Sequence, residues 1–396
     1  MLNKNNIREL AYVAEITSID PIIGSDNCES ATVGGWHIMV RKGQFKVGDK
    51  CVYFEIDSKL DTKKECFAFL EKCNGKIKTQ RYTFGGKGNF VSQGLIMQLS
   101  ECGLKYDDYN IGDFLTEKLE VKYAEEADNK RKANDRPQYK SSFNKIKKYK
   151  IIKYLMRYGW FKKVIFKIFG VHKKKKDYPW FVVKSDEERC QNIPQQVFDD
   201  KNITYEVTEK IDGTSSTYAI ERLHKNKYQV YICSRNVVVF DGKKIKQGGY
   251  YSDIENPYMA SDKQYNILMS LTDYMDKNKN VKWCYLQGET YGDHIQKRNY
   301  RLKITDFKAF TFVDSTRPRY TYSEMKEILD NYNIPTVPIL QTGFVLPDNC
   351  DELLEIAGGK SKLDGEMREG IVLRSEQNPQ FSFKAVDNNF ILKYHG

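Results

Sequence analysis

Residues 206–213 read Glu-Val-Thr-Glu-Lys-Ile-Asp-Gly, and the lysine in this stretch, Lys210, decides how the second half of the chain is interpreted. Positions 203–208 alternate between apolar and polar residues, which predicts a strand, and Asp212 and Gly213 predict a tight turn after it. The turn would place an amine beside a carboxylate. Four residues of this kind also recur by chance, so an ordinary surface hairpin remains an alternative until the rest of the chain is considered.

Several short segments follow Lys210 in a fixed order. They are Ser234-Arg235-Asn236, then Gly288-Glu289-Thr290-Tyr291-Gly292, then Phe307-Lys308-Ala309-Phe310, then Glu369-Gly370-Ile371-Val372-Leu373-Arg374, and last Phe383-Lys384 through Leu392-Lys393. The series resembles the ordered motifs of the covalent nucleotidyltransferases, which comprise polynucleotide ligases and mRNA capping enzymes. The order is difficult to obtain by chance, so it outweighs the surface-hairpin interpretation.

Length and composition predict a two-domain cytoplasmic protein. The 396 residues are enough for two cores, and the nine cysteines contain no Cys-x-x-Cys pair, so neither a disulfide framework nor a zinc knuckle is expected. No apolar signal core and no membrane-spanning apolar run occur. We expect an intracellular protein in a reducing compartment, without a membrane contact and acting as a monomer.

The positive charge of the chain is concentrated in one segment. Residues 130–176 hold 18 Lys and Arg against one Asp, a net charge of +17, so the rest of the chain carries −6 within an overall +11. Such a segment suits a polyphosphate backbone. Within it, 151–169 resembles a basic amphipathic helix. Three interpretations stay open: a helix packed on a domain, an RNA contact, and a membrane-surface contact.

The predicted fold class is α+β, with three regions. Residues 1–120 form an OB-type β-barrel, although an SH3-like barrel gives the same pattern; residues 121–177 form a basic linker or insertion; and residues 178–396 form an antiparallel-sheet domain. Strands are expected at Leu10–Ile19, Trp36–Arg41, Cys51–Ile56 and Gly94–Leu99, and helices at Cys66–Lys72, Gln264–Lys277, Tyr322–Tyr332 and Cys350–Ala357.

The resemblance implies that Lys210 is a nucleophile that attacks the α-phosphate of a nucleoside triphosphate. A free lysine has a pKa of about 10.4 and is a poor nucleophile at neutral pH. Neighbouring cations can lower that pKa, and we expect Lys384, Lys393 and a bound Mg²⁺ to do so while also neutralising the phosphate. Plain surface lysines are the competing interpretation for both lysines.

The other motif residues acquire roles from the same resemblance. Glu289 would bind the ribose, one of Phe307, Phe310 and Phe312 (first Phe310) would stack on the purine, and Glu369, helped by Asp212, would hold Mg²⁺ or Mn²⁺. Arg235 would bridge the nucleotide and an incoming 5′-phosphate, and Glu209 is expected to contribute to the nucleotide site. Core or surface positions remain the alternatives.

The order of the domains resembles one branch of the superfamily. DNA ligases and capping enzymes place an OB domain after the transferase domain, whereas the candidate OB domain here stands in front. This resembles the fifth family of ATP-dependent RNA ligases. The stretches Val47–Phe54, Ser92–Leu95 and Lys184–Asn192 agree with that branch, while 121–177 does not.

The resemblance implies an ATP-dependent ligase that forms a Lys210–AMP intermediate, adenylylates an RNA 5′ end and seals a 3′-hydroxyl/5′-phosphate break. Its partner would be RNA or a nicked duplex that contains RNA. The alternatives are a DNA or tRNA ligase with the same chemistry, a non-catalytic nucleic-acid-binding relative, and a capping guanylyltransferase.

Overall fold

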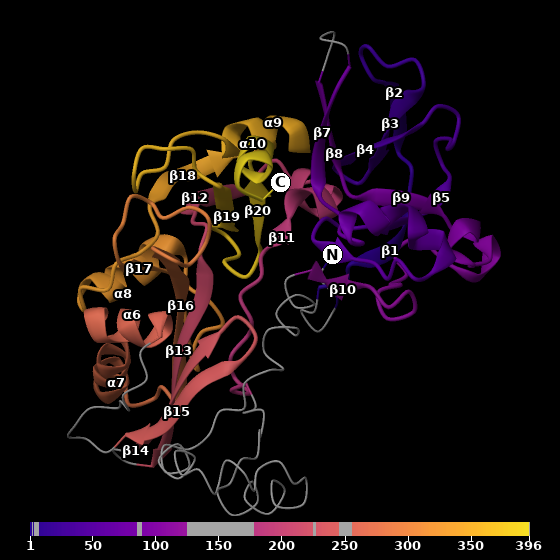
Figure 1. The fold of residues 1–396 in the computed structure, drawn as a ribbon. Helices are drawn as coiled ribbons and strands as arrows, with labels where there is room; N and C mark the ends of the chain where they lie inside the picture. The colour runs from indigo at the N-terminus through magenta and orange to yellow at the C-terminus, as the bar shows by residue number, and fades with distance from the viewer. Residues whose placement is uncertain are drawn as a thin grey trace, which may run out of the picture.

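The computed structural model describes residues 1, 3, 8–84, 89–124, 178–224, 227–244 and 256–395. The chain forms an N-terminal and a C-terminal domain that lie side by side, with the short strand β11 (Glu188–Arg189) close to the boundary (Figure 1). Residues 125–177, most of the predicted basic segment and its helix, lie outside the described residues. In the described part, no helix is long and apolar enough to cross a bilayer.

The N-terminal domain consists of short antiparallel strands. One sheet joins β1 (Ala11–Glu15), β5 (Lys50–Phe54) and β9 (Leu95–Gln98), and a second joins β2 (Ser18–Pro21), β3 (Cys28–Val33) and β4 (Trp36–Arg41). Two strand pairs, β7 (Thr79–Thr83) with β8 (Asn89–Gln93) and β6 (Ser58–Lys59) with β10 (Lys122–Tyr123), accompany them. Three 3₁₀ helices span Glu65–Cys73, Ser100–Cys102 and Tyr106–Asp108.

The single strand expected over Leu10–Ile19 is wrong, because the chain changes sheets in the middle of it. Ile16 N–H donates to the Asp49 carbonyl at 3.0 Å, and Thr17 N–H donates to the Thr32 carbonyl at 2.9 Å. These two residues therefore form a corner between β1 and β2. One alternating run can serve two sheets when the strand bends in this way.

The two domains share part of a core. One apolar cluster of the N-terminal domain, around Trp36 and Tyr53, also includes Val386 and Ile391 of the C-terminal domain. A second cluster around Phe54 and Phe67 lies wholly within the N-terminal domain. Shared burial holds the faces of the two domains together.

The C-terminal domain contains two five-stranded sheets. The larger sheet, which has the longer strands, has the order β15 (Val238–Lys244), β14 (Lys227–Ser234), β13 (Thr214–His224), β16 (Trp283–Gly292) and β17 (Thr305–Asp314). All of its strand pairs are antiparallel. The other has the order β11, β20 (Ser382–Val386), β19 (Gly370–Ser375), β12 (Thr204–Lys210) and β18 (Ile339–Val345), in which only the β11–β20 pair is parallel.

Helices cover the larger sheet on one side (Figure 1). They are α6 (Pro257–Tyr265), α7 (Ile267–Lys277) and α8 (Tyr322–Asp330), the last of which begins with a capping box between Thr321 and Glu324. Asn266, at φ +50°, separates α6 from α7, so the single helix expected from Gln264 is divided. The remaining helical segments are Cys190–Asn192, α5 (Pro194–Phe198), α9 (Cys350–Ala357), α10 (Asn388–Phe390) and a π-helical turn, Ile391–His395.

Candidate active site

A cavity of about 400 Å³ is lined by charged residues of both domains. The C-terminal domain contributes the end of β12 with its following turn, together with parts of β16, β17, β19 and β20. The N-terminal domain contributes Arg8, Asp57, Lys78 and Tyr123. The site is therefore built from both domains, whereas the sequence predicted all of its residues within the C-terminal domain.

Lys210 is the last residue of β12 and pairs there with Gly370 of β19. This register brings Glu369 against the lysine, and Nζ donates to its carboxylate at 2.7 Å. Burial alone would lower the pKa of Lys210, but Glu369, Glu289 and Asp212 outweigh burial and raise it. The predicted lowering of the Lys210 pKa by Lys384 and Lys393 is therefore wrong, because the charges that dominate at the amine are those of carboxylates.

Cations also gather in the cavity around Asp186. Lys384 Nζ donates to Oδ1 of Asp186 at 2.9 Å, and Arg235 Nη2 donates to Oδ2 at 2.8 Å. Burial lowers the pKa of Lys384 to about 8, with help from Arg8 and Arg189 and against the opposing effect of Asp186. Burial would raise the pKa of Asp186, but Lys384, Arg8 and Arg235 hold it well below its usual range. The carboxylate of Asp186 thus interacts with Lys384, Arg235 and Arg8 at the same time.

Two further carboxylates lie in the cavity wall near Lys210. Burial raises the pKa of Glu289 to about 8, with Glu369 and Asp212 adding to the rise and Lys210 opposing it. Asp212 is buried, its backbone N–H donates to the Tyr300 hydroxyl at 2.7 Å, and its Oδ2 accepts no hydrogen bond from a described residue. Three carboxyl groups, those of Glu289, Glu369 and Asp212, thus act on the amine of Lys210.

The oxygen donors fit a divalent cation that is shared with a ligand. In the part of the chain that is described, no group of three or more His, Cys, Asp or Glu side chains could hold a metal ion by itself. Mg²⁺ uses only one or two protein carboxylates and fills its shell with waters and phosphate oxygens. The unsatisfied Asp212 oxygen and the carboxylate of Glu369 agree with that incomplete kind of site.

The structure distinguishes the three candidate aromatic residues by whether they line the cavity. Phe310 lines the cavity, whereas Phe307 and Phe312 lie in the core with exposures of 0% and 1%. A Cβ on Gly288 would lie 2.3 Å from ring carbons of Phe307, so glycine is required for this close approach of β16 and β17. Phe310 is therefore the aromatic residue of the three that can contact a base.

Lys393 does not join the other candidate residues. It lies in the π-helical turn with an exposed side chain and is absent from the described cavity lining. His395 reaches the cavity instead, with Nε2 3.4 Å from Oδ1 of Asp212, and this contact raises the pKa of His395. Residues two positions apart in a helix point to different faces, which explains why only one of them reaches the site.

The carboxylate of Glu209 is also engaged elsewhere. It accepts hydrogen bonds from the Ser361 hydroxyl and, at 2.7 Å, from the Lys362 N–H. Consecutive strand residues point to opposite faces, so Glu209 anchors the loop before β19 while Lys210 faces the cavity. Glu209 nevertheless lines the cavity, and its expected contribution to the nucleotide site stays a prediction.

Sequence reasoning missed Asp186, Arg8 and His395. Asp186 lies in the Lys184–Asn192 stretch, whose resemblance to a ligase motif was the available signal. Nothing in the local sequence around Arg8 or His395 marks them, because folding alone brings them to the cavity.

Comparisons with known proteins match both domains. Residues 203–395 match the sequence model of the RNA ligase family, and residues 10–99 match an OB-fold domain. The chain is similar to the RNA ligase of Naegleria gruberi in complex with pyrophosphate, at 25% identity and a TM-score of 0.72, covering 98% of this chain and 99% of that one. No curated protein gives a significant match.

Two variants of the same Naegleria gruberi ligase are similar to the same extent. One, with AMP and Mn, has 25% identity and a TM-score of 0.70 over 98% of this chain and 99% of the other. Another, with ATP and Mn, has 25% identity and a TM-score of 0.71 over 98% and 100%. The predicted fold class, an N-terminal OB-fold domain followed by a ligase-type domain, is therefore confirmed.

Proposed function

We propose that the chain is an ATP-dependent RNA ligase of the fifth RNA ligase family. Lys210 Nζ attacks the α-phosphorus of ATP, the bond to pyrophosphate breaks, and AMP stays on the lysine. AMP then passes to an RNA 5′-phosphate, and a neighbouring 3′-hydroxyl displaces it to form the phosphodiester. The observation that carries the proposal is the placement of Lys210, Glu289, Phe310, Glu369 and Lys384 in one cavity.

The walls of the cavity give each part of ATP a partner. The cavity-lining ring of Phe310 suits the adenine ring, and the carboxyl group of Glu289 suits ribose hydroxyls. Lys384 and Arg235 supply the cations that neutralise phosphate oxygens as the bond to the leaving group breaks. The Naegleria gruberi ligase complexes with ATP, AMP and pyrophosphate support this assignment.

Lys210 must lose a proton before it attacks. Its Nζ hydrogen bonds to Glu369, which places this carboxylate where the proton leaves. Glu369 and Asp212 would hold a divalent cation, Mg²⁺ or Mn²⁺, whose charge would balance these carboxylates beside the amine and supply attraction for phosphate oxygens. The lysine would then have a lower pKa than in the arrangement described above.

The test is covalent labelling of the purified protein with ATP that carries its label in the α-phosphate. Wild type with Mg²⁺ should retain the label on a denaturing gel, and Lys210→Ala should not. Lys326→Ala, which removes an exposed lysine of α8, is the matched control and should label like wild type. The same experiment with GTP in place of ATP tests which base the protein accepts. If wild type stays unlabelled even after pyrophosphate has stripped any bound AMP, a non-catalytic binding role replaces the proposal.

The second test concerns the polynucleotide. Nicked duplexes with RNA or DNA on the 3′-hydroxyl strand separate an RNA ligase from a DNA ligase, since both would pass the labelling test. We expect sealing where the 3′-hydroxyl strand is RNA. Equal sealing of an all-DNA nick would favour the DNA ligase alternative.

A further inference from the structure

The loop that joins β16 to β17 adopts an unfavourable backbone conformation. Two consecutive residues of this loop, Tyr300 and Arg301, have φ values of +53° and +56°. This left-handed conformation is disfavoured for residues other than glycine, and it persists only where contacts with the surroundings impose it. The contacts of Tyr300 and of its neighbour Arg298 therefore indicate what the loop holds in place.

Tyr300 holds the main chain of the turn after Lys210. The Tyr300 side chain is 3% exposed, and its hydroxyl accepts the hydrogen bond from the backbone N–H of Asp212 at 2.7 Å. From the same loop, Gln296 Nε2 donates to the carbonyl of Gly213 at 3.1 Å. Both bonds act on main-chain atoms, so they fix the turn while the side chains of Lys210 and Asp212 stay available to the cavity.

Arg298 connects Tyr300 to the segment before Glu369. Its guanidinium carbon lies 4.0 Å from the ring centroid of Tyr300, which is a cation–π contact. Its Nη1 donates to the carbonyl of Met367, which closely precedes Glu369, and its Nη2 donates to Oδ1 of Asp364 at 2.5 Å. A continuous series of contacts thus runs from the turn after β12 to the segment that carries Glu369.

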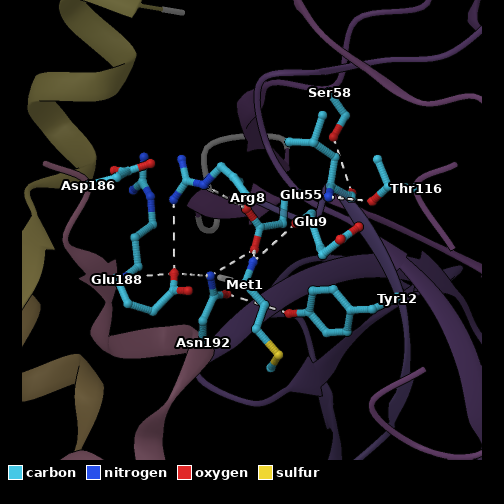
Figure 2. Close-up of polar contacts among 12 residues, drawn as sticks. Met1, Arg8, Glu9, Tyr12, Glu55, Ser58, Thr116, Asp186, Glu188 and Asn192 are labelled. Atoms are coloured by element: carbon cyan, nitrogen blue, oxygen red, sulfur yellow. Dashed lines mark hydrogen bonds and ion pairs between the residues drawn. The ribbon is translucent and has the colours of Figure 1, made fainter. Parts of the chain in front are cut away.

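The described contacts of Tyr300 and Arg298 lie within the C-terminal domain. Figure 2 shows polar contacts of a different kind, which join the two domains; there Asn192 Nδ2 donates to Glu55 of the N-terminal domain at 2.7 Å. Tyr300 and Arg298 are also absent from the described cavity lining. They can therefore affect the reaction only through the groups that they hold in place.

We propose that Tyr300 and Arg298 are positioning residues for the attack of Lys210 on ATP. They hold the turn that carries Asp212 and the segment that carries Glu369 in one arrangement. Lys210 Nζ and the carboxylate to which it donates at 2.7 Å then face the α-phosphate together. This inference rests on the proposed function and adds to it two residues that do not contact the substrate. Misplacement of a reacting group by about 1 Å can slow a reaction about a hundredfold, so the loss of this support should be visible in the rate.

The test compares two tyrosine-to-phenylalanine variants. Tyr300→Phe removes the acceptor of the Asp212 N–H and keeps the aromatic ring. Tyr228→Phe is the matched control, because Tyr228 is 1% exposed and also pairs with an arginine, whose guanidinium carbon lies 5.2 Å from its ring centroid. The Tyr228 hydroxyl accepts a hydrogen bond from this Arg222 at 3.0 Å and donates to Asp276 at 2.6 Å. None of these three residues belongs to the described cavity lining.

We expect Tyr300→Phe to slow the covalent labelling of Lys210 about tenfold at saturating ATP, with the KM for ATP within about twofold of wild type. Arg298→Lys, which keeps the charge but loses the planar guanidinium, should slow the same step. Tyr228→Phe should label at the wild-type rate. This separation of rate from KM would not arise if Tyr300 only stabilised the fold.

Two further readouts define the role of Tyr300. Hydrogen exchange of a peptide spanning residues 206–214 should be faster in Tyr300→Phe than in wild type and Tyr228→Phe, because the Asp212 N–H has lost its acceptor. Burial, with a contribution from Glu369, raises the pKa of Tyr300, so its hydroxyl stays neutral and the labelling defect should be the same at every pH tested. A pH profile of different shape would identify proton transfer by Tyr300 and overturn the positioning role.

A purely structural tyrosine gives another pattern. Tyr300→Phe and Tyr228→Phe would then lower the temperature of unfolding alike and label Lys210 at the wild-type rate, which would overturn the inference while the proposed function stands. If wild type itself never acquires label, the proposed ligase function fails. The exchange experiment then decides by itself whether Tyr300 holds the turn, and equal exchange in wild type and Tyr300→Phe would overturn that contact as well.

Discussion

Replacing Asp186 by asparagine keeps the shape of the side chain and removes its charge, so it isolates the contribution of this carboxylate. Asp186 is 14% exposed, and both of its oxygens accept a bond from a cation, Lys384 at 2.9 Å and Arg235 at 2.8 Å. In Asp186→Asn these two cations and Arg8 stay close together without their common counter-charge. We therefore expect a loss of stability well above that of a surface substitution.

The magnitude follows from the geometry. A hydrogen bond to a charged group contributes about 1.5–3 kcal/mol, and removal of one partner of a buried ion pair costs about 3–5 kcal/mol. We expect the free energy of unfolding to fall by about 3–5 kcal/mol at neutral pH. Added pyrophosphate should restore more stability to Asp186→Asn than it adds to wild type, because it replaces the missing negative charge.

The assay is urea unfolding followed by tryptophan fluorescence, with the m-value as a check that the transition stays the same. Asp348→Asn is the matched control, because Asp348 is 89% exposed and pairs with Lys201 at 3.2 Å, a contact worth about 0–1 kcal/mol. The reasoning is refuted if Asp186→Asn and Asp348→Asn lose the same small amount of stability with unchanged m-values.

Three further predictions concern the cavity and its support. Phe310→Ala should raise the KM for ATP roughly tenfold in the labelling assay, because base stacking is worth about 1–3 kcal/mol, and an unchanged KM would move the adenine elsewhere. Gly288→Ala should cost about 1–3 kcal/mol in thermal unfolding, because its Cβ would lie 2.3 Å from Phe307; a wild-type transition would contradict the packing argument. Lys384, with a pKa of about 8, is charged below that pH and neutral above it, so the KM for ATP should rise on the alkaline side. In Lys384→Arg this rise should move to higher pH, and identical profiles would exclude Lys384 as its source.

Local patterns in the sequence predicted much of the fold. The alternation before Lys210 predicts β12, and strands at Trp36–Arg41 and near Gly94 are found where the pattern places them. These predictions succeed because a strand with one buried face needs an alternating pattern within itself. The pattern failed to predict the break at Ile16, where an equally regular run is divided between two sheets. The residues of the run do not determine which strands they pair with.

For the candidate site too, some features could be predicted from the sequence and others depend on the tertiary structure. The sequence by itself determined the chemical types, a lysine at a strand end followed by carboxylates, an aromatic residue and a late lysine in a fixed order. The tertiary structure alone decided that Phe310 faces the cavity, that Asp186 joins Lys384 to Arg235, and that Arg8 of the other domain reaches them. The physical reason is that burial, pairing register and domain contact depend on residues distant in the chain, which a local pattern does not record.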